Sequence, residues 1–170
     1  MLRVEFKAPW SRSLRKSTAL STAILCAICA VGLLVSSGSP LLRYTLAMLP
    51  FAVVLAASLF VVRGYVLTDD AIEVTRLGWT TALPLTTLQS VEGNTEAMRG
   101  SLCVFANGGL FACTGIFWNR RLGLHRAFAT DRSRAVVLRY PRRTVVLTPH
   151  DPQHFIVRVR TLLKIAQFPK

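Results

Sequence analysis

Residues 17–62 read STALSTAILCAICAVGLLVSSGSPLLRYTLAMLPFAVVLAASLFVV, which is two apolar runs joined by a short break. Residues 17–42 and 44–62 contain no Lys, Arg, Asp or Glu, and Arg43 stands alone between them. The hydrocarbon core of a bilayer is about 30 Å thick, and an apolar helix of about 20 residues crosses it. Both runs reach that length, so we predict a transmembrane hairpin of two helices over residues 17–63, with its turn at residues 37–40.

The charges that flank the two runs predict the orientation of the hairpin. Before the first run stand one acidic residue, Glu5, and five basic ones: Arg3, Lys7, Arg12, Arg15 and Lys16. The loop between the runs carries only Arg43. Because short loops rich in Lys and Arg stay in the cytoplasm, we expect both termini there, with residues 1–16 as a basic tail and residues 64–170 as a cytoplasmic domain. The alternative for the first run is a cleaved secretory signal peptide, since small residues follow it.

The length and charge of residues 64–170 indicate how many domains follow the hairpin and which partners suit them. Residues 64–170 are long enough for one small domain with its own core. They carry fourteen Lys and Arg against seven Asp and Glu, in a chain whose formal net charge is +13. Such a balance suits an anionic membrane surface or nucleic acid. We expect the membrane to be the partner and nucleic acid not to be, because the sequence shows no reading helix or ribonucleoprotein motif.

The four cysteines do not indicate a disulfide framework. Cys26 and Cys29 lie inside the first apolar run, whereas Cys103 and Cys113 lie in the predicted domain. The Cys26-Ala-Ile-Cys29 spacing also occurs in redox motifs, but a thiol inside a bilayer lacks the water that would help it ionise. We therefore expect these two residues to act as small packing residues between helices.

Beyond Arg63 the pattern changes to short segments with the period of β-strands. We expect six or seven short strands, near residues 65–68, 71–77, 79–83, 101–105, 125–129, 135–140 and 144–147, and another short element at residues 85–91. The glycine-rich residues 107–123 predict an irregular loop instead. A closing helix starts at Asp151 and Pro152, with an apolar stripe of Ile156, Val159, Leu163 and Ala166. The predicted class is α+β: the hairpin, then an antiparallel β barrel or sandwich capped by this C-terminal amphipathic helix.

Several segments resemble the bacterial pleckstrin-homology (PH) domain membrane proteins. They are RGYVLTD at 63–69, LPLTTLQSVE at 83–92, NRRLG at 119–123, ATD at 129–131, RRTVVLTP at 142–149 and APWS at 8–11. The resemblance implies a seven-stranded, two-sheet barrel closed by the C-terminal helix, in the inner membrane of a bacterium. It implies little about activity. Eukaryotic PH domains bind inositides through a basic loop between their first two strands, and the corresponding turn here is the acidic Asp69-Asp70.

The predicted loop suggests a ligand-binding surface. Residues 110–122 combine aromatic and aliphatic side chains with two arginines, a composition typical of segments that lie in the headgroup region of a membrane. We predict an anionic-lipid surface made of Phe117, Trp118, Arg120, Arg121, Arg126, Arg142 and Arg143. The alternative is that the rings of residues 110–122 close the barrel core while the arginines are only solvated. For Arg142 and Arg143, the alternative is that they form a solubilising turn at the tip of a β-hairpin.

The sequence does not predict an active site. His150, Asp151 and His154 are close in sequence, but Asp151 is better explained as the cap of the final helix than as a metal ligand. His125 lies in a predicted strand and has no evident acid or nucleophile partner in the sequence. We therefore predict no catalytic residue, no metal and no cofactor. The expected function is a membrane-anchored, non-catalytic binding module that engages anionic phospholipid headgroups or a protein partner; the alternative is a structural protein whose domain self-associates.

Overall fold

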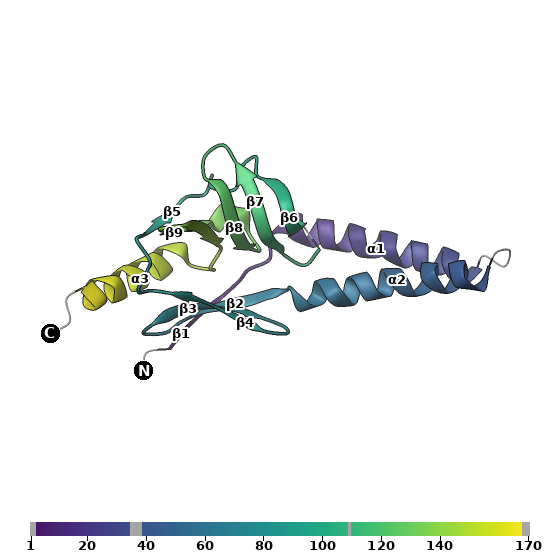
Figure 1. Ribbon diagram of the computed structural model, residues 1–170, viewed down its shortest axis with the longest axis horizontal. Coiled ribbons are helices and arrows are strands. Elements are labelled where there is room, and N and C mark those ends of the chain that lie inside the picture. The colour runs from purple at the N-terminus through teal and green to yellow at the C-terminus, as the bar shows by residue number, and fades with distance from the viewer. Residues whose placement is uncertain (1–2, 35–38, 109, 168–170) are drawn as a thin grey trace.

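The computed structural model describes residues 3–34, 39–108 and 110–167. Two long helices, α1 (Arg12–Leu34) and α2 (Pro40–Leu59), lie side by side and extend from one end of a β-rich domain. The third helix, α3 (Pro152–Gln167), lies at the opposite end of the molecule (Figure 1). The predicted order of hairpin, β domain and closing helix is confirmed.

Both helices of the hairpin are long and apolar enough to cross a membrane, and only 11% of the most apolar window of each is buried inside the structure. The helices approach closely at Gly32, where an added Cβ would lie 2.6 Å from the Cβ of Leu46. Cys29 Sγ donates a hydrogen bond to the carbonyl of Ala47 at 3.2 Å, so this thiol lies at the helix contact. Of the predicted turn at residues 37–40, residues 37 and 38 lie outside the described residues.

The start of α2 follows from local chemistry. The Leu42 N–H donates to Ser39 Oγ at 3.3 Å, and Pro40 occupies the first turn, where its missing N–H costs no helix hydrogen bond. Pro50 lies inside the helix. Arg43, the charge that interrupts the apolar stretch, donates from Nη2 to the carbonyl of Leu33 on α1 at 3.4 Å. The helix therefore begins with a side-chain cap and an inter-helix hydrogen bond.

The first sheet contains four antiparallel strands in the order β1-β2-β3-β4. They are β1 (Val4–Lys7), β2 (Val62–Leu67), β3 (Ala71–Arg76) and β4 (Thr80–Pro84). Strand β1 belongs to the segment that we predicted as a basic tail, and it adds a strand to the first sheet. The sequence did not predict this strand because β1 has only four residues. Its single buried ring, Phe6, packs against residues that are distant in the sequence.

The ladder between β1 and β2 brackets the helical hairpin. Val4 pairs with Leu67 and Lys7 with Gly64, and the Ala8 N–H continues the ladder to the carbonyl of Arg63 at 3.3 Å. An added Cβ at Gly64 would lie 2.8 Å from the carbonyl oxygen of Phe6, so only glycine permits this approach. Both ends of the hairpin therefore leave the domain from the same end of one strand pair.

The second sheet contains six strands in the order β5-β9-β10-β8-β7-β6. They are β5 (Ser90–Gly93), β6 (Leu102–Gly108), β7 (Cys113–Asn119), β8 (Gly123–Ala129), β9 (Val136–Tyr140) and β10 (Arg143–Leu147), with a short 3-10 helix, η1 (Arg132–Arg134), between β8 and β9. The pairing of β8 with β10 is parallel, and the other pairs are antiparallel. The α+β class is confirmed, with ten strands among the described residues rather than the expected seven.

The irregular loop predicted over residues 107–123 was wrong. Its residues complete β6, form all of β7 and begin β8. Gly115 (φ 137°) does not interrupt β7, where it pairs with Ala106 on β6 and Ala127 on β8. Gly123 (φ 65°) makes the tight turn into β8. Glycine composition alone predicts a break, whereas cross-strand pairing decides whether the strand continues.

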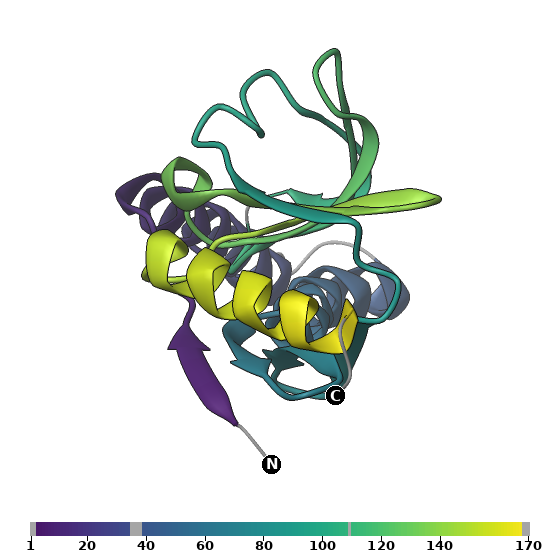
Figure 2. The same cartoon turned by 90° about the vertical axis from the view of Figure 1, so that its left-hand side faces the viewer.

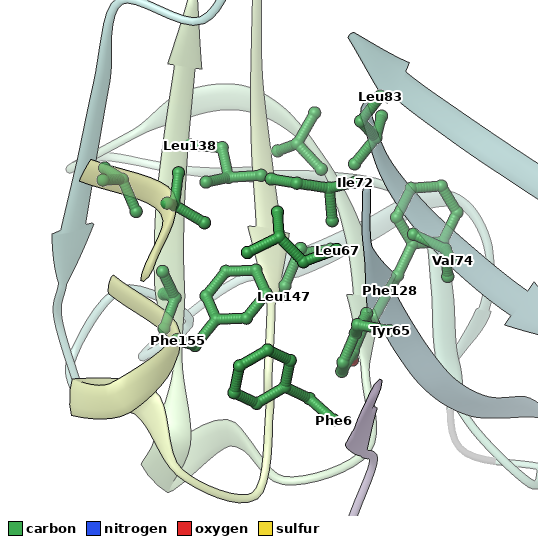
Figure 3. Close-up of a cluster of buried hydrophobic side chains, with 14 of the residues drawn as sticks. Phe6, Tyr65, Leu67, Ile72, Val74, Leu83, Phe128, Leu138, Leu147 and Phe155 are labelled. Atoms are coloured by element: carbon green, nitrogen blue, oxygen red, sulfur yellow. The ribbon is translucent and has the colours of Figure 1, made fainter. Parts of the chain in front are cut away.

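The main core lies between the two sheets and α3. Figure 3 shows Phe6, Tyr65, Phe155 and Leu147 meeting with side chains from both sheets, all of them buried. The Phe6 and Phe155 rings meet edge to face at 5.1 Å. On α3, Ile156 and Val159 are buried and Leu163 is half-buried, so the described part of the predicted apolar stripe faces the core. The helix covers the domain end seen in front in Figure 2.

A second, smaller core lies on the other face of the six-stranded sheet. Phe117, Ala127, Val137 and Val146 contribute from four neighbouring strands, and Ala97 and Met98 cover them. Asn119 fixes this cover, since its Nδ2 donates to the carbonyl of Ala97 at 2.7 Å and its Oδ1 accepts from the Leu122 N–H at 2.7 Å. The turn from β7 to β8 is therefore tied to the second core.

The Tyr65 hydroxyl joins the two sheets. It donates to the carbonyl of Phe128 at 2.5 Å and accepts from the N–H of Thr148 at 3.1 Å, and all three residues are fully buried. Burial raises the pKa of Tyr65 to about 12, so the hydroxyl keeps its proton and remains a donor at neutral pH. Tyr140 is also buried, but its hydroxyl has no hydrogen-bond partner within the described parts of the chain.

We expect Tyr65→Phe to lower the free energy of unfolding by about 1–3 kcal/mol, since it leaves a buried carbonyl and a buried N–H without this partner. Tyr140→Phe is the matched control, and it should leave stability unchanged or raise it, because the Tyr140 hydroxyl has no hydrogen-bond partner among the described residues. Unfolding of the full chain in one detergent, followed by near-UV circular dichroism, measures both. Equal losses in the two variants would contradict the bridging role.

We expect Phe6→Ala to cost about 3–5 kcal/mol, as is usual for truncating a buried ring, although Phe6 lies outside the predicted domain. Lys7→Ala, on the exposed side of the same strand, is the control and should change stability by no more than about 0.5 kcal/mol. The same unfolding measurement applies. An unchanged stability in Phe6→Ala would mean that β1 is not part of the folded domain.

Candidate membrane interface and groove

The β3–β4 turn lies beside the end of α2, where the hairpin enters the domain (Figure 1). The rings of Phe60 and Trp79 meet edge to face at 4.9 Å, and Leu77 in the same turn is 47% exposed. Gly78 lies so close to α2 that an added Cβ would be 3.7 Å from Cδ2 of Leu59. Exposed aromatic and aliphatic side chains at the end of an apolar helix are typical of a membrane–water interface.

A second group of rings lies at the start of α1. Trp10 and Phe111 have ring centroids 6.3 Å apart, and both are half-buried. The Phe111 N–H donates to Thr18 Oγ1 at 3.0 Å, and the Ser11 N–H donates to the carbonyl of Thr130 at 3.1 Å. These hydrogen bonds attach the first turns of α1 to the β6–β7 connection and to the end of β8.

Strand β6 is an edge of the six-stranded sheet, on the side of the helices (Figure 1). Leu102, Val104 and Phe105 are 63, 58 and 81% exposed. Their register pairs Leu102 with Trp118 and Phe105 with Ile116, and both partners on β7 are also partly exposed. One continuous apolar surface therefore runs from the β6 edge onto β7.

A groove of about 890 Å³ separates this surface from the last turns of α2. Its lining is mostly apolar and comes from α2 (Val53, Ala56, Ala57) and its C-cap Phe60, β6 (Cys103, Val104, Phe105), the β6–β7 connection (Leu110), β7 (Thr114, Gly115, Ile116) and two arginines, Arg76 and Arg126. None of these lining residues is acidic. The groove lies where the domain meets the hairpin.

The guanidinium groups of both arginines contact one aromatic ring. The guanidinium carbons of Arg76 and Arg126 lie 4.7 and 4.9 Å from the centroid of Phe128, which is fully buried. Arg76 is only 6% exposed; its Nη2 donates to Thr81 Oγ1 at 2.7 Å, and its Nε has no partner among the described residues. Burial, followed by the charge of Arg126, lowers the pKa of Arg76. Among the described residues that line the groove, two arginines therefore carry positive charge and no acidic side chain balances it.

The structure divides the residues that we predicted as a lipid-binding surface. Phe117 is 1% exposed and belongs to the second core, where it stacks on His125, so an interfacial role for its ring was wrong. Trp118, the next residue, is 42% exposed on the opposite face of β7. Side chains alternate along a strand, so residues 110–122 combine the two alternatives. Some of their rings close a core, and others are exposed.

The remaining predicted arginines lie on different parts of the domain. Arg126 lines the groove. Arg120 and Arg121 occupy the β7–β8 turn, which points away from the helical hairpin in Figure 1, and Arg121 lies 3.8 Å from the carboxylate of Glu96. Arg142 and Arg143 lie at the β9–β10 turn, and the parallel pairing of β10 with β8 places this turn at the same end of the sheet. Arg143 also lies over the ring of Tyr140.

Sequence reasoning missed Arg76, Trp79 and Phe105 as site residues. Arg76 carried a signal, since it continues the inward alternation of Ile72 and Val74 along β3, where an apolar residue is expected. Trp79 and Phe105 carried none, because their exposure depends on the position of the hairpin. A charged residue in a core-facing register is the observation that could have located the groove.

The groups that could suggest catalysis have structural roles in the described residues. Asp151 Oδ1 accepts from the His154 N–H at 3.0 Å, which is a helix cap. His125 is buried, with Nδ1 2.9 Å from the carbonyl of Gly123, and its ring stacks on Phe117. The described parts of the chain contain no group of three His, Cys, Asp or Glu side chains that could hold a metal ion.

Comparison with protein families gives one match, to the bacterial PH domain, over residues 63–163. Comparison with curated proteins and with solved structures gives no match. The matched region contains all of β2 except its first residue, β3 to β10 and most of α3, and it excludes β1 and the helical hairpin. Since the match covers more than half of the chain and the two-sheet architecture with its closing helix agrees with it, this protein belongs to the bacterial PH domain family.

Proposed function

We propose that this protein is a membrane-anchored, non-catalytic binding module whose domain engages anionic phospholipid headgroups at the cytoplasmic face of the bacterial inner membrane. The observation that carries the proposal is the exposed apolar and aromatic surface around the helix ends, which adjoins basic side chains. PH domains are binding modules, and the family match supports that general role. The two apolar helices support an anchor.

Basic residues surround the points where the hairpin enters the domain. Arg12, Arg15 and Lys16 are exposed on the first turns of α1, and Arg63 is exposed next to the end of α2. A basic side chain near an anionic membrane surface contributes about 1 kcal/mol. Of the residues predicted from sequence, the proposed surface keeps Arg126, which lines the groove. Trp118 is exposed, but it lies next to the β7–β8 turn and is left out. The proposed surface also leaves out Arg120, Arg121, Arg142 and Arg143, whose turns lie away from the helix ends.

Self-association remains a second candidate function, and strand β6 favours it. It is an edge of its sheet, where a further strand can be added, and its exposed Leu102, Val104 and Phe105 could be covered by another copy of the chain. Lipid is the better-supported ligand of this region, because the same surface adjoins the helices and two arginines without acidic neighbours in the groove. A dimer would be visible in the mass spectra described below.

The topology can be tested with single cysteines in a variant that lacks the four native ones. Thr95→Cys lies in an exposed turn of the domain and should react with a membrane-impermeant maleimide in inverted inner-membrane vesicles but not in intact spheroplasts. Leu41→Cys, exposed at the first turn of α2, should give the opposite result. Labelling of Thr95→Cys in intact spheroplasts would contradict a cytoplasmic domain.

Anionic lipid should be enriched around the full-length protein. In nanodiscs of equal phosphatidylcholine and phosphatidylglycerol, we expect tryptophan fluorescence to be quenched more when phosphatidylglycerol carries the bromine than when phosphatidylcholine does. The triple variant Arg12→Gln, Arg15→Gln, Lys16→Gln should reduce this difference, and added salt should reduce it further.

The matched control removes the same charge at the far end of the sheet, by Arg120→Gln, Arg142→Gln and Arg143→Gln. It should leave the quenching difference unchanged, because these side chains lie in turns away from the helix ends. Equal quenching by the two brominated lipids in the unmodified protein would overturn the proposed function. An equal effect of the two triple variants would contradict the assignment to the helix ends.

A further inference from the structure

The groove between α2 and the six-stranded sheet combines features that the proposed headgroup contacts do not use. Its apolar wall is made by Val53, Ala56 and Ala57 on the last two turns of α2 and by the C-cap Phe60, and α2 is long enough to span a bilayer. Its opposite wall is the apolar surface of β6 and β7. A groove bounded by the end of a spanning helix is open to the lipid of the adjacent leaflet.

The polar groups of the groove are concentrated at its domain end. Arg76 is more than nine-tenths buried, and its Nε has no hydrogen-bond partner in the part of the chain that the structure describes. Thr114 lines the same groove, is 6% exposed and has a buried hydroxyl that is also unpartnered there. Arg126 adds a second guanidinium over the same Phe128 ring. Arg76 also lies over the ring of Trp79, at 5.2 Å, but no acidic side chain lines the groove among the described residues. A buried guanidinium nitrogen and a buried hydroxyl without described partners, beside a second guanidinium, are complementary to an anion that accepts hydrogen bonds.

We propose that this groove binds one anionic phospholipid of the cytoplasmic leaflet, with its phosphate held by Arg76 and Arg126 and one acyl chain lying along α2 against β6 and β7.

The dimensions of the groove agree with this occupant. Phe60 and Val53 are seven residues apart on α2, which corresponds to about 10 Å along a helix axis. That length is about two thirds of one leaflet of a hydrocarbon core about 30 Å thick. The volume of about 890 Å³ lies in the range of sites that bind small molecules. The phosphate would then lie at the end of the helix, at the depth where headgroups occur.

The charge of the groove favours a phospholipid over an apolar protein segment. A peptide helix or strand could cover the β6 edge, but it would leave both guanidinium groups without a counter-ion in an apolar site, which is costly. A phosphate provides the acceptors, and arginine binds phosphate with two parallel hydrogen bonds. A bound phospholipid would therefore cover the apolar walls with its acyl chain and place its phosphate against the two arginines.

This inference rests on the proposed function only in placing the domain against the cytoplasmic leaflet. It differs from headgroup enrichment around the helix ends because it requires one lipid molecule in a defined stoichiometry. Native mass spectrometry of the full chain, released from nanodiscs of equal phosphatidylcholine and phosphatidylglycerol, measures that stoichiometry. We expect one phosphatidylglycerol molecule to remain bound to each protein after the other lipids have been removed.

Two variants test the two parts of the site. Arg126→Gln removes a charge from an exposed position, so the fold should be retained, and we expect the affinity for the retained lipid to fall by about tenfold or more, as for the loss of one charge-assisted phosphate contact. Ala56→Phe fills the apolar wall from an exposed position on α2, changes no charge and should also displace the lipid. Arg76→Gln should have the largest effect, but it also removes the contact with Thr81.

Arg142→Gln with Arg143→Gln is the control for overall charge and should retain the bound lipid. A lipid that survives both Arg126→Gln and Ala56→Phe, or that is lost equally in the control, would overturn the groove site. In that case the brominated-lipid difference would still be present, and the proposed function would stand. Retention of phosphatidylcholine in place of phosphatidylglycerol, or a dimer without lipid, would also overturn the site.

Discussion

The backbone ladder between β1 and β2 is the constraint on which the rest of the structure depends. It joins a strand that precedes the helical hairpin to the strand that follows it, so the hairpin is inserted between two neighbouring strands of one sheet. The close approach of Gly64 to the carbonyl of Phe6 makes this pairing specific. Because Phe6 also packs on Phe155 of α3, the same strand links the hairpin to the main core and to the closing helix.

This arrangement gives the domain a defined orientation relative to the helices. With both ends of the hairpin leaving one end of the β1–β2 pair, the β3–β4 turn is held next to α2, and the β6–β7 connection is held next to α1 by Phe111 and Thr18. The apolar edge of β6 then faces the hairpin, and the groove forms between them. The β7–β8 and β9–β10 turns, with their four arginines, lie at the other end of the sheet. The same set of pairings therefore determines which basic residues lie close to the helix ends.

The groove also explains why a charged side chain occupies a core-facing position in β3. Ile72 and Val74 point into the main core, and Arg76 continues that register at the point where the core ends and the groove begins. There the alkyl part of the side chain packs, and the guanidinium lies over Phe128 and hydrogen-bonds to Thr81. Burial of an arginine is costly unless its charge is compensated. The proposed anion in this groove would supply that compensation.

The sequence by itself determined the properties that depend on near neighbours in the chain. Run length and hydropathy located the hairpin, the Asp151 cap and the Ile156 and Val159 spacing located α3, and alternation identified most strands and the α+β class. Tertiary structure alone decided that residues 4–7 complete a sheet, that residues 113–119 form a strand, and that Phe117 is buried while Trp118 is exposed. It also decided the groove, whose walls come from four segments far apart in sequence. The physical reason is that periodicity records which side chains share a face, whereas strand pairing and packing between distant segments determine what covers that face.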